Sequence, residues 1–593
     1  MGKVIEINGP LVTVELADVP NGEQVKIGGL NLIGEVIARS GDHALVQMYE
    51  PTESLRPGEP VEALGHPLSV ELGPGLLGGI FDGVQRPLLE HAEQHGDYVP
   101  RGVHLPPLDR GKLWHFEPQT ELRGGTRVED GTVLGTVQET PSILHRILVP
   151  PGMGGELQDL AAAGTVTVDT VIAHVKDAHG KTQELKLFHR WPVRIPRPYH
   201  SRDNAVAPLL TGQRILDTFF PLVKGGRAAV PGPFGAGKTI VQQQIARWSD
   251  ADIVIYVGCG ERGNELVDIL ESFPELTDPT TGRSLMERTL LVANTSNMPV
   301  VAREASIYVG ATLAEYYRDQ GYDVVMVADS TSRWAEALRE VAGRLGQMPV
   351  EEGYPAYLAS RLAAFYERAG RVTTLAGDSG SITLIGAVSP PGGDFSEPVT
   401  SHTKEIVQTF WALSKELADA RHYPAVDWVE SFSGYVASCS GWWADNVDSR
   451  WAEHRAAALG ILSQADELAR IVNLVGPEAL SPPQRWALEG VALFKEGVLQ
   501  QSALDPVDSY CSPQKQFALL DQTLAIYRQG MKLLEQGVPV QELLRMPLLA
   551  QVQRLKNGYS NEQMDELRNF ATQAEAEFNR LSDEYAQHGK ASS

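Results

Sequence analysis

One short segment of the sequence combines the residue types that could hold a phosphate group. The pattern G-x-x-x-x-G-K-[ST] is met by Gly232-Pro233-Phe234-Gly235-Ala236-Gly237-Lys238-Thr239. Glycines allow a backbone to wrap around a phosphate with successive N–H groups turned inward, and a following helix adds the positive end of its dipole. Lys238 would reach the outer phosphates, and Thr239 would offer a hydroxyl to Mg²⁺. We therefore predict a nucleotide-binding loop; the alternative is a glycine-rich turn that binds nothing.

A carboxylate follows a second apolar run. The stretch Val324-Val325-Met326-Val327-Ala328 ends at Asp329. An aspartate at the end of a buried strand near a phosphate loop is typical of a magnesium site. The alternative is that this segment only caps a helix starting at Thr331. We predict that Thr239 and Asp329 serve the metal.

Two charged residues occupy a third loop, Gly258-Cys259-Gly260-Glu261-Arg262-Gly263. It fits the dinucleotide pattern G-x-G-x-x-G, but it comes after a complete phosphate loop and carries charges where a pyrophosphate cradle favours small residues. We predict instead that Glu261 orients a water for attack on the terminal phosphate and that Arg262 contacts the phosphate or an adjacent chain. The alternative is an exposed ion pair worth roughly 0–1 kcal/mol.

These loops need strands and helices that hold them at one edge of a sheet. From about residue 195 short apolar runs alternate with helical spacing, which predicts a parallel α/β sheet. The strands are expected at 254–257, 289–292, 324–327 and 381–385, and the helices near 238–248, 262–272, 300–319 and 331–345.

The rest of the chain divides by composition. Short β-like runs at 1–72 predict a small barrel, with a loose β-sandwich as the alternative. A Gly- and Pro-rich connector at 73–115 and an inserted β-rich domain at 116–190 precede the nucleotide-binding domain at 191–445. Residues 446–593 are rich in Ala, Leu, Gln and Glu and predict a helical C-terminal domain.

Bulk properties restrict the class of protein. The formal net charge is −24, which opposes nucleic-acid binding through a broad basic face. The three cysteines, Cys259, Cys439 and Cys511, show no CxxC spacing, so a zinc site or disulfide framework is not expected. There is no signal-peptide pattern, and no apolar run reaches about 18 residues, so we expect no membrane-spanning helix.

Several long segments together point to one family. The catalytic A subunit of V/A-type rotary ATPases resembles this chain in GPFGAGKT, VGCGERGNE, ADSTSRWAEALRE, EEGYPAYL and GAVSPPGGDFSEPVT. The resemblance implies an N-terminal β-barrel, an inserted β-rich bulge domain, a P-loop α/β nucleotide-binding domain and a C-terminal helical domain. It implies Mg²⁺ with ATP or ADP, held by Lys238 and Thr239 and supported by Asp329. Glu261 would polarise the attacking water, and Arg262 would respond to the γ-phosphate.

The same resemblance implies partners. Such proteins form rings of three A and three non-catalytic B subunits, in which an arginine of the neighbouring B subunit completes the site. A central shaft, peripheral stalks and a membrane sector complete an ion-translocating enzyme that couples ATP hydrolysis or synthesis to proton or sodium-ion transport. The chain would be a peripheral protein on the cytoplasmic face of a membrane, with no nucleic-acid partner.

The adenine pocket is expected in the C-terminal half. The segment Ser431-Phe432-Ser433-Gly434-Tyr435 matches one that holds the base in the family, so Phe432 or Tyr435 would stack on adenine; the alternative is that both pack in the core. Leu504 stands where the family often has an aromatic residue. The competing interpretations of the whole chain are a secretion or flagellar export ATPase, a transcription-termination helicase, and a non-catalytic subunit.

Overall fold

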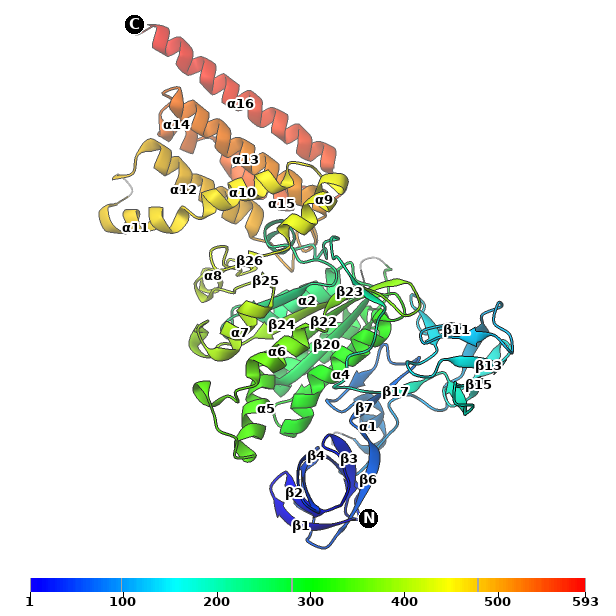
Figure 1. Cartoon of the computed structure of the whole chain (residues 1–593). Coiled ribbons are helices and arrows are strands. Elements are labelled where there is room, and N and C mark those ends of the chain that lie inside the picture. The colour runs from blue at the N-terminus through cyan, green and yellow to red at the C-terminus, as the bar shows by residue number, and fades with distance from the viewer. Residues whose placement is uncertain (1, 97–98, 279–280, 477–478, 592–593) are drawn as a thin grey trace.

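The computed structural model describes residues 2–96, 99–278, 281–476 and 479–591 of the 593-residue chain. Figure 1 shows a β-barrel at one end and a bundle of helices at the other, with a large helix-covered sheet between them and a smaller β-rich part projecting to one side. The first and last described residues lie at opposite ends of the molecule (Figure 1). The expected four-part architecture is confirmed.

The N-terminal strands close into a barrel, which excludes the sandwich alternative. Alternate residues, such as Val12 and Val14, are fully buried inside it, as the two-residue repeat of a strand requires. The strands run in the order β1-β2-β5-β4-β3-β6. Their bounds are β1 (Gly2–Asn8), β2 (Leu11–Glu15), β3 (Glu23–Ile27), β4 (Leu32–Ser40), β5 (His43–Met48) and β6 (Pro60–Pro67).

The projecting part is an insertion with a stem. Strand β7 (Ser69–Leu72) pairs antiparallel with β17 (His189–Pro192), so the segment between them begins and ends at neighbouring positions. Before it enters the projecting part, this segment contributes β8 (Ile80–Phe81) to the central sheet. The insertion contains two four-stranded sheets, ordered β12-β11-β9-β14 and β10-β13-β15-β16. Their bounds are β9 (Trp114–Pro118), β10 (Arg127–Val128), β11 (Val133–Gln138), β12 (Leu144–Leu148), β13 (Gly155–Leu160), β14 (Gly164–Val166), β15 (Val171–Lys176) and β16 (Thr182–Lys186).

The central sheet has ten strands. Its main path is β26-β25-β19-β24-β22-β20-β21-β8, and β18 joins through β23 to β24. The five strands from β19 to β21 are parallel. The bounds are β8 (Ile80–Phe81), β18 (Ser201–Asp203), β19 (Arg227–Pro231), β20 (Ile253–Glu261), β21 (Thr289–Thr295), β22 (Asp323–Asp329), β23 (Gly370–Thr373), β24 (Ser379–Val388), β25 (Thr409–Phe410) and β26 (Phe432–Ser433).

Helices cover both faces of this sheet (Figure 1). Along β20, Ile253, Ile255 and Val257 enter one hydrophobic core, whereas Val254 and Tyr256 enter the other, so the strand is apolar on both faces. This burial explains why the sequence shows apolar runs rather than alternation. The helices are α1 (Leu88–His95), α2 (Lys238–Trp248), α3 (Gly263–Glu275), α4 (Val300–Arg318), α5 (Thr331–Arg344), α6 (Leu358–Tyr366), α7 (Pro398–Ile406) and α8 (Lys415–Asp419). The four predicted strands and four predicted helices of the core are confirmed.

The C-terminal part is helical, as expected, and a buried ion pair joins it to the sheet domain. Arg214 is fully buried, and its Nη1 lies 2.6 Å from Oδ1 of Asp508. In the described part of the chain, none of the helices is both long and apolar enough to cross a membrane. The helices are α9 (Val436–Asn446), α10 (Trp451–Leu462), α11 (Ala465–Val475), α12 (Pro482–Phe494), α13 (Pro513–Glu535), α14 (Val540–Leu544), α15 (Pro547–Gly558) and α16 (Met564–Ala591).

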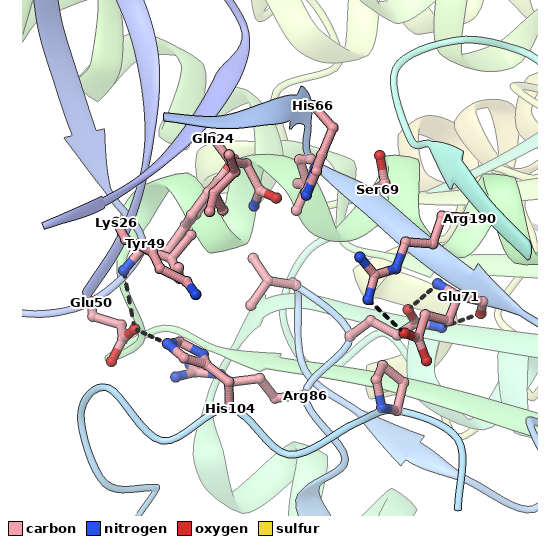
Figure 2. A pocket seen from close by; sticks show the side chains of 16 residues that line it. Gln24, Lys26, Tyr49, Glu50, His66, Ser69, Glu71, Arg86, His104 and Arg190 are labelled. Carbon is pink, nitrogen blue, oxygen red and sulfur yellow. Dashed lines mark hydrogen bonds and ion pairs between the residues drawn. The ribbon is translucent and has the colours of Figure 1, made fainter. Parts of the chain in front are cut away.

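A polar cavity of about 400 Å³ lies between the barrel and the residues around β7 (Figure 2). Both carboxylates in its lining already have partners. Glu71 is bonded to Arg190 at 3.0 Å and to Arg110 at 2.6 Å, and Glu50 accepts the backbone N–H of Gly102 at 2.6 Å. Glu71 thus connects β7 to Arg190 on β17 and to Arg110, and Glu50 connects the end of the barrel to the segment around Gly102.

Candidate nucleotide-binding site

The phosphate loop forms where β19 ends and α2 begins. Gly235 and Gly237 have φ angles of 82° and 87°, in the left-handed region that glycine adopts without steric cost. The turn at Gly237 lets α2 start directly at Lys238, so the free N–H groups of the helix face the space above the loop. The sequence prediction of a strand, loop and helix is confirmed here.

Lys238 and Asp329 come together at the carboxyl edge of the sheet. The Nζ atom of Lys238 lies 3.8 Å from Oδ1 of Asp329, and Tyr256 donates its hydroxyl to Oδ2 at 3.1 Å. Burial raises the pKa of Asp329 to about 6, and the neighbouring ammonium opposes this shift. In the described residues, Oδ1 of Asp329 is buried without a hydrogen-bond donor. An unused buried acceptor at this place fits the outer ligand sphere of a cation.

Glu261 is the last residue of β20, next to β22 in the sheet. Burial raises the pKa of its carboxyl group, the charge of Glu265 acts in the same direction, and Lys238 opposes the shift. A carboxylate with a raised pKa is a better proton acceptor than an exposed glutamate. The position and the electrostatics therefore suit a group that orients water.

Lys238 and Glu261 line a cavity of about 860 Å³. Four cations, Lys238, Arg262, Arg333 and Lys415, contribute to its lining, so the cavity suits a multiply charged anion. The lining residues are Pro233, Phe234, Gly235, Gly237, Lys238, Thr239, Ile240, Glu261, Arg262, Asn264, Glu265, Arg333, Ser389, Pro390, Pro391, Gly392, Lys415 and Tyr423. Of the predicted loop, Gly232 and Ala236 are absent from this lining.

Two aromatic residues line the cavity: Phe234 belongs to the predicted loop, whereas Tyr423 is not one of the residues predicted to hold the base. A Cβ atom at Gly237 would lie 3.4 Å from Cε1 of Tyr423. By contrast, the ring of Phe432 stacks on Phe410 with centroids 5.5 Å apart, and the hydroxyl of Tyr435 accepts the backbone N–H of Arg227 at 3.1 Å. The structure therefore does not bring Phe432 and Tyr435 to this cavity, and it supports their alternative role in packing.

Sequence analysis missed Tyr423, Arg333, Lys415 and Ser389. Lys415 begins the five-residue helix α8, and Tyr423 lies in the loop after it, so neither residue stands in a segment with strand or long-helix periodicity. Arg333 is on α5 within the quoted segment ADSTSRWAEALRE, and both carboxylate oxygens of Glu336 lie within 2.9 Å of its Nη1. Ser389 follows the last residue of β24, a position comparable to that of Asp329 at the end of β22, and this similarity could have singled it out.

The donor set suits magnesium held largely by phosphates and water. Thr239 lines the cavity, and the carboxylate of Asp329 lies 3.8 Å from Nζ of Lys238. In the described ranges no group of three or more His, Cys, Asp or Glu residues could form a complete metal cage. Mg²⁺ in nucleotide sites commonly uses one or two protein ligands and keeps several waters. The residues present fit this arrangement.

The fold and the loop define a P-loop nucleotide-binding protein with a barrel before the sheet domain and a helical domain after it. Family profiles agree with each part. The ATP synthase alpha/beta family profiles match 4–65 as the beta-barrel domain, 105–194 as the barrel-sandwich domain and 212–433 as the nucleotide-binding domain. The C-terminal domain of V and A type ATP synthase matches 440–544.

Individual relatives narrow the family further. The chain is 69% identical to the V-type ATP synthase alpha chain of Nitrosococcus oceani, over 100% of both chains. It is 53% identical to the corresponding chain of the A-type ATP synthase of Thermococcus kodakarensis, covering 94% of this chain and 95% of the other. The chain belongs to the family of catalytic alpha chains of V/A-type ATP synthases. As the catalytic subunit it is an ATP-hydrolysing enzyme of the ATPase and ATP synthase class.

A solved structure shares the fold. The assembled ATPase EscN from the type III secretion system of enteropathogenic E. coli superposes with a TM-score of 0.62, covering 88% of this chain and 100% of that chain at 21% identity. This similarity concerns the architecture alone. Because the chain is 69% identical over its full length to a V-type ATP synthase alpha chain, the V/A-type assignment replaces the export ATPase interpretation.

Proposed function

We propose that the 860 Å³ cavity binds Mg–ATP and that Glu261, Lys238 and Arg262 carry the reaction. The observation that supports this most is the convergence of Lys238, Glu261 and Asp329 at one edge of the sheet. The phosphate loop would surround the β- and γ-phosphates, with Lys238 neutralising their charge. Thr239 and Asp329 would serve Mg²⁺, which would offset charge on the phosphate oxygens.

Hydrolysis needs a water in line with the bond that breaks. Glu261 would accept a hydrogen bond from this water and direct its lone pair at the terminal phosphorus. Arg262, Arg333 and Lys238 would face the equatorial oxygens, where negative charge is spread in the transition state. The Tyr423 ring would stack on the adenine.

The chain would act within a larger complex. We propose an alternating ring with three non-catalytic B subunits, where an arginine of the neighbouring B subunit contributes about 10³–10⁵ in rate. The central shaft and peripheral stalks would connect the ring to a membrane sector that moves protons or sodium ions. The ring would lie on the cytoplasmic face, and the domain limits are proposed at 1–72, 73–115, 116–190, 191–445 and 446–593.

The test compares complexes captured through a tag on this chain. Wild type should hydrolyse Mg–ATP, and Glu261→Gln should bind ATP with similar affinity but lose at least about 100-fold in turnover, because the amide is a poor proton acceptor. Glu271→Gln, on the exposed side of the nearby helix α3, is the matched control and should keep wild-type turnover. Equal turnover in the wild-type and Glu261→Gln complexes would refute the catalytic assignment of Glu261.

A further inference from the structure

Strand β24 ends between the phosphate loop and Asp329, the two parts of the phosphate site. In the sheet β24 lies between β19, which leads into the phosphate loop, and β22, which ends at Asp329. The carboxyl ends of these parallel strands meet at one edge, so the residue after β24 is flanked by both parts. That residue is Ser389, and its side chain lines the nucleotide cavity.

Ser389 is held from two directions. Lys238 donates from Nζ to the hydroxyl oxygen of Ser389. The backbone N–H of Ser389 donates to the hydroxyl oxygen of Ser332 at 2.9 Å. Ser332 lies in the first turn of α5, three residues after Asp329. Ser389 is thus bonded to the lysine of the phosphate loop and to the helix that follows the metal aspartate.

The chemistry of a hydroxyl group allows it to serve a phosphate at the same time. A serine hydroxyl carries one proton to donate and two lone pairs that accept. While it accepts from Lys238, it can donate its own proton to a phosphate oxygen. Lys238 would reach the β- and γ-phosphates, and Ser389 is bonded to the far end of this side chain, whose Nζ also lies 3.8 Å from Oδ1 of Asp329. The phosphate nearest to the hydroxyl would be the terminal one.

We propose that the hydroxyl of Ser389 donates a hydrogen bond to the terminal phosphate of ATP and thereby distinguishes ATP from ADP. This inference rests on the proposed function, because it assigns a further residue to the same nucleotide site. Before nucleotide binds, the hydroxyl keeps the Lys238 ammonium directed into the site and away from full contact with Asp329. With ATP bound it bonds both the ammonium and a γ-phosphate oxygen, and the bond to Ser332 carries this contact to the start of α5.

The test measures binding separately from turnover. Complexes containing Ser389→Ala, Ser389→Thr or Ser396→Ala are titrated with Mg–ADP and with a non-hydrolysable Mg–ATP analogue. Ser396 lies on the same loop, and its hydroxyl donates to Asp394 at 2.7 Å, so Ser396→Ala removes an equivalent group outside the cavity.

The expected result is a selective loss. A hydrogen bond to a charged group contributes enough to predict roughly tenfold weaker binding of the ATP analogue by Ser389→Ala. Mg–ADP binding should change less than about twofold, Ser389→Thr should restore ATP binding, and Ser396→Ala should match wild type. Equal losses for both nucleotides, or no loss for either, would overturn the inference but would not contradict the proposed function. Unchanged binding by a Lys238→Ala complex would instead remove the proposed function, and this inference with it.

Discussion

The guanidinium group of Arg262 lies over the ring of Phe234, with its central carbon 4.8 Å from the ring centre. Phe234 belongs to the phosphate loop, yet its side chain is 78% exposed. An aromatic face attracts a cation at this distance. The arginine that we place near the γ-phosphate is therefore held by the loop that binds the phosphates.

Removing the ring should release the arginine. Phe234→Leu keeps an apolar side chain but loses the π face, which at exposed sites is worth about 0.5–1 kcal/mol. We expect ATP turnover to fall about two- to fivefold, as this energy implies. Phe234→Tyr keeps the ring and should retain the wild-type turnover. Equal turnover by Phe234→Leu and Phe234→Tyr in steady-state kinetics would contradict the role of the ring.

The base-binding role of Tyr423 has a direct test. Stacking of a base on an aromatic side chain is worth about 1–3 kcal/mol, so Tyr423→Ala should weaken ATP binding roughly tenfold or more. Tyr423→Phe should bind as wild type does. Inorganic tripolyphosphate has no base, and its affinity should be the same for all three proteins. A loss of tripolyphosphate binding in Tyr423→Ala would mean that the residue shapes the loop instead.

A buried carboxylate joins the insertion to the sheet domain. Oε1 of Glu139 accepts the backbone N–H groups of Gly75, Leu76 and Leu77 at 2.8–3.1 Å, and Oε2 lies 2.6 Å from Nδ1 of His145. Tyr317 on α4 donates its hydroxyl to the same carboxylate at 3.0 Å. Burial alone would raise the pKa of Glu139, but the histidine and the backbone donors hold it below its usual value.

This carboxylate should stabilise the junction above mildly acidic pH. Its folded pKa lies below the unfolded value, so its contribution is complete above about pH 4.3 and is lost as the pH falls through the folded pKa. At pH 7, Glu139→Gln should cost roughly 3 kcal/mol, because it weakens the buried hydrogen bonds that the charged carboxylate accepts. Hydrogen exchange at residues 75–77 should then speed up in the variant at neutral pH, and the difference should shrink in acid. Identical exchange in both proteins at pH 7 would argue against this role.

His422, next to Tyr423, is the opposite kind of group, a buried base. Burial and the positive charges of Lys495 and Lys556 lower its pKa to about 4. When this region opens, the exposed His422 takes up a proton between about pH 6.5 and pH 4, whereas the buried His422 does not. The free energy that keeps the region folded therefore decreases as the pH falls through this window, by up to about 3 kcal/mol. Limited proteolysis around residues 414–430 should accelerate at about pH 5 relative to neutral pH. His422→Gln should abolish this dependence; an unchanged pH profile would exclude His422 as its source.

The sequence predicts elements best where local pattern and final environment agree. The buried strands of the central sheet, such as β20 and β22, and the loop before Lys238 carry their signal within a few residues. Strand β8 carries almost none, because its two residues become a strand only by pairing with β21, far along the chain. Tyr423 reaches Gly237 only through tertiary packing, and the local pattern around Phe432 is equally aromatic. The sequence alone therefore could not show which aromatic side chain lies beside the distant phosphate loop.

The stem of β7 and β17 has a consequence for how this protein can change in length. Because the chain departs and returns in adjacent paired strands, the ends of an inserted segment are already close, and lengthening it adds little closure entropy. The insertion would tolerate a foreign domain, such as a fluorescent reporter, at its outer turns. Excision is different: without Glu139 and His145, the hydroxyl groups of Tyr316 and Tyr317 on α4 would lose their partners. A protein that lost the insertion would thus also need apolar residues in place of Tyr316 and Tyr317 on α4.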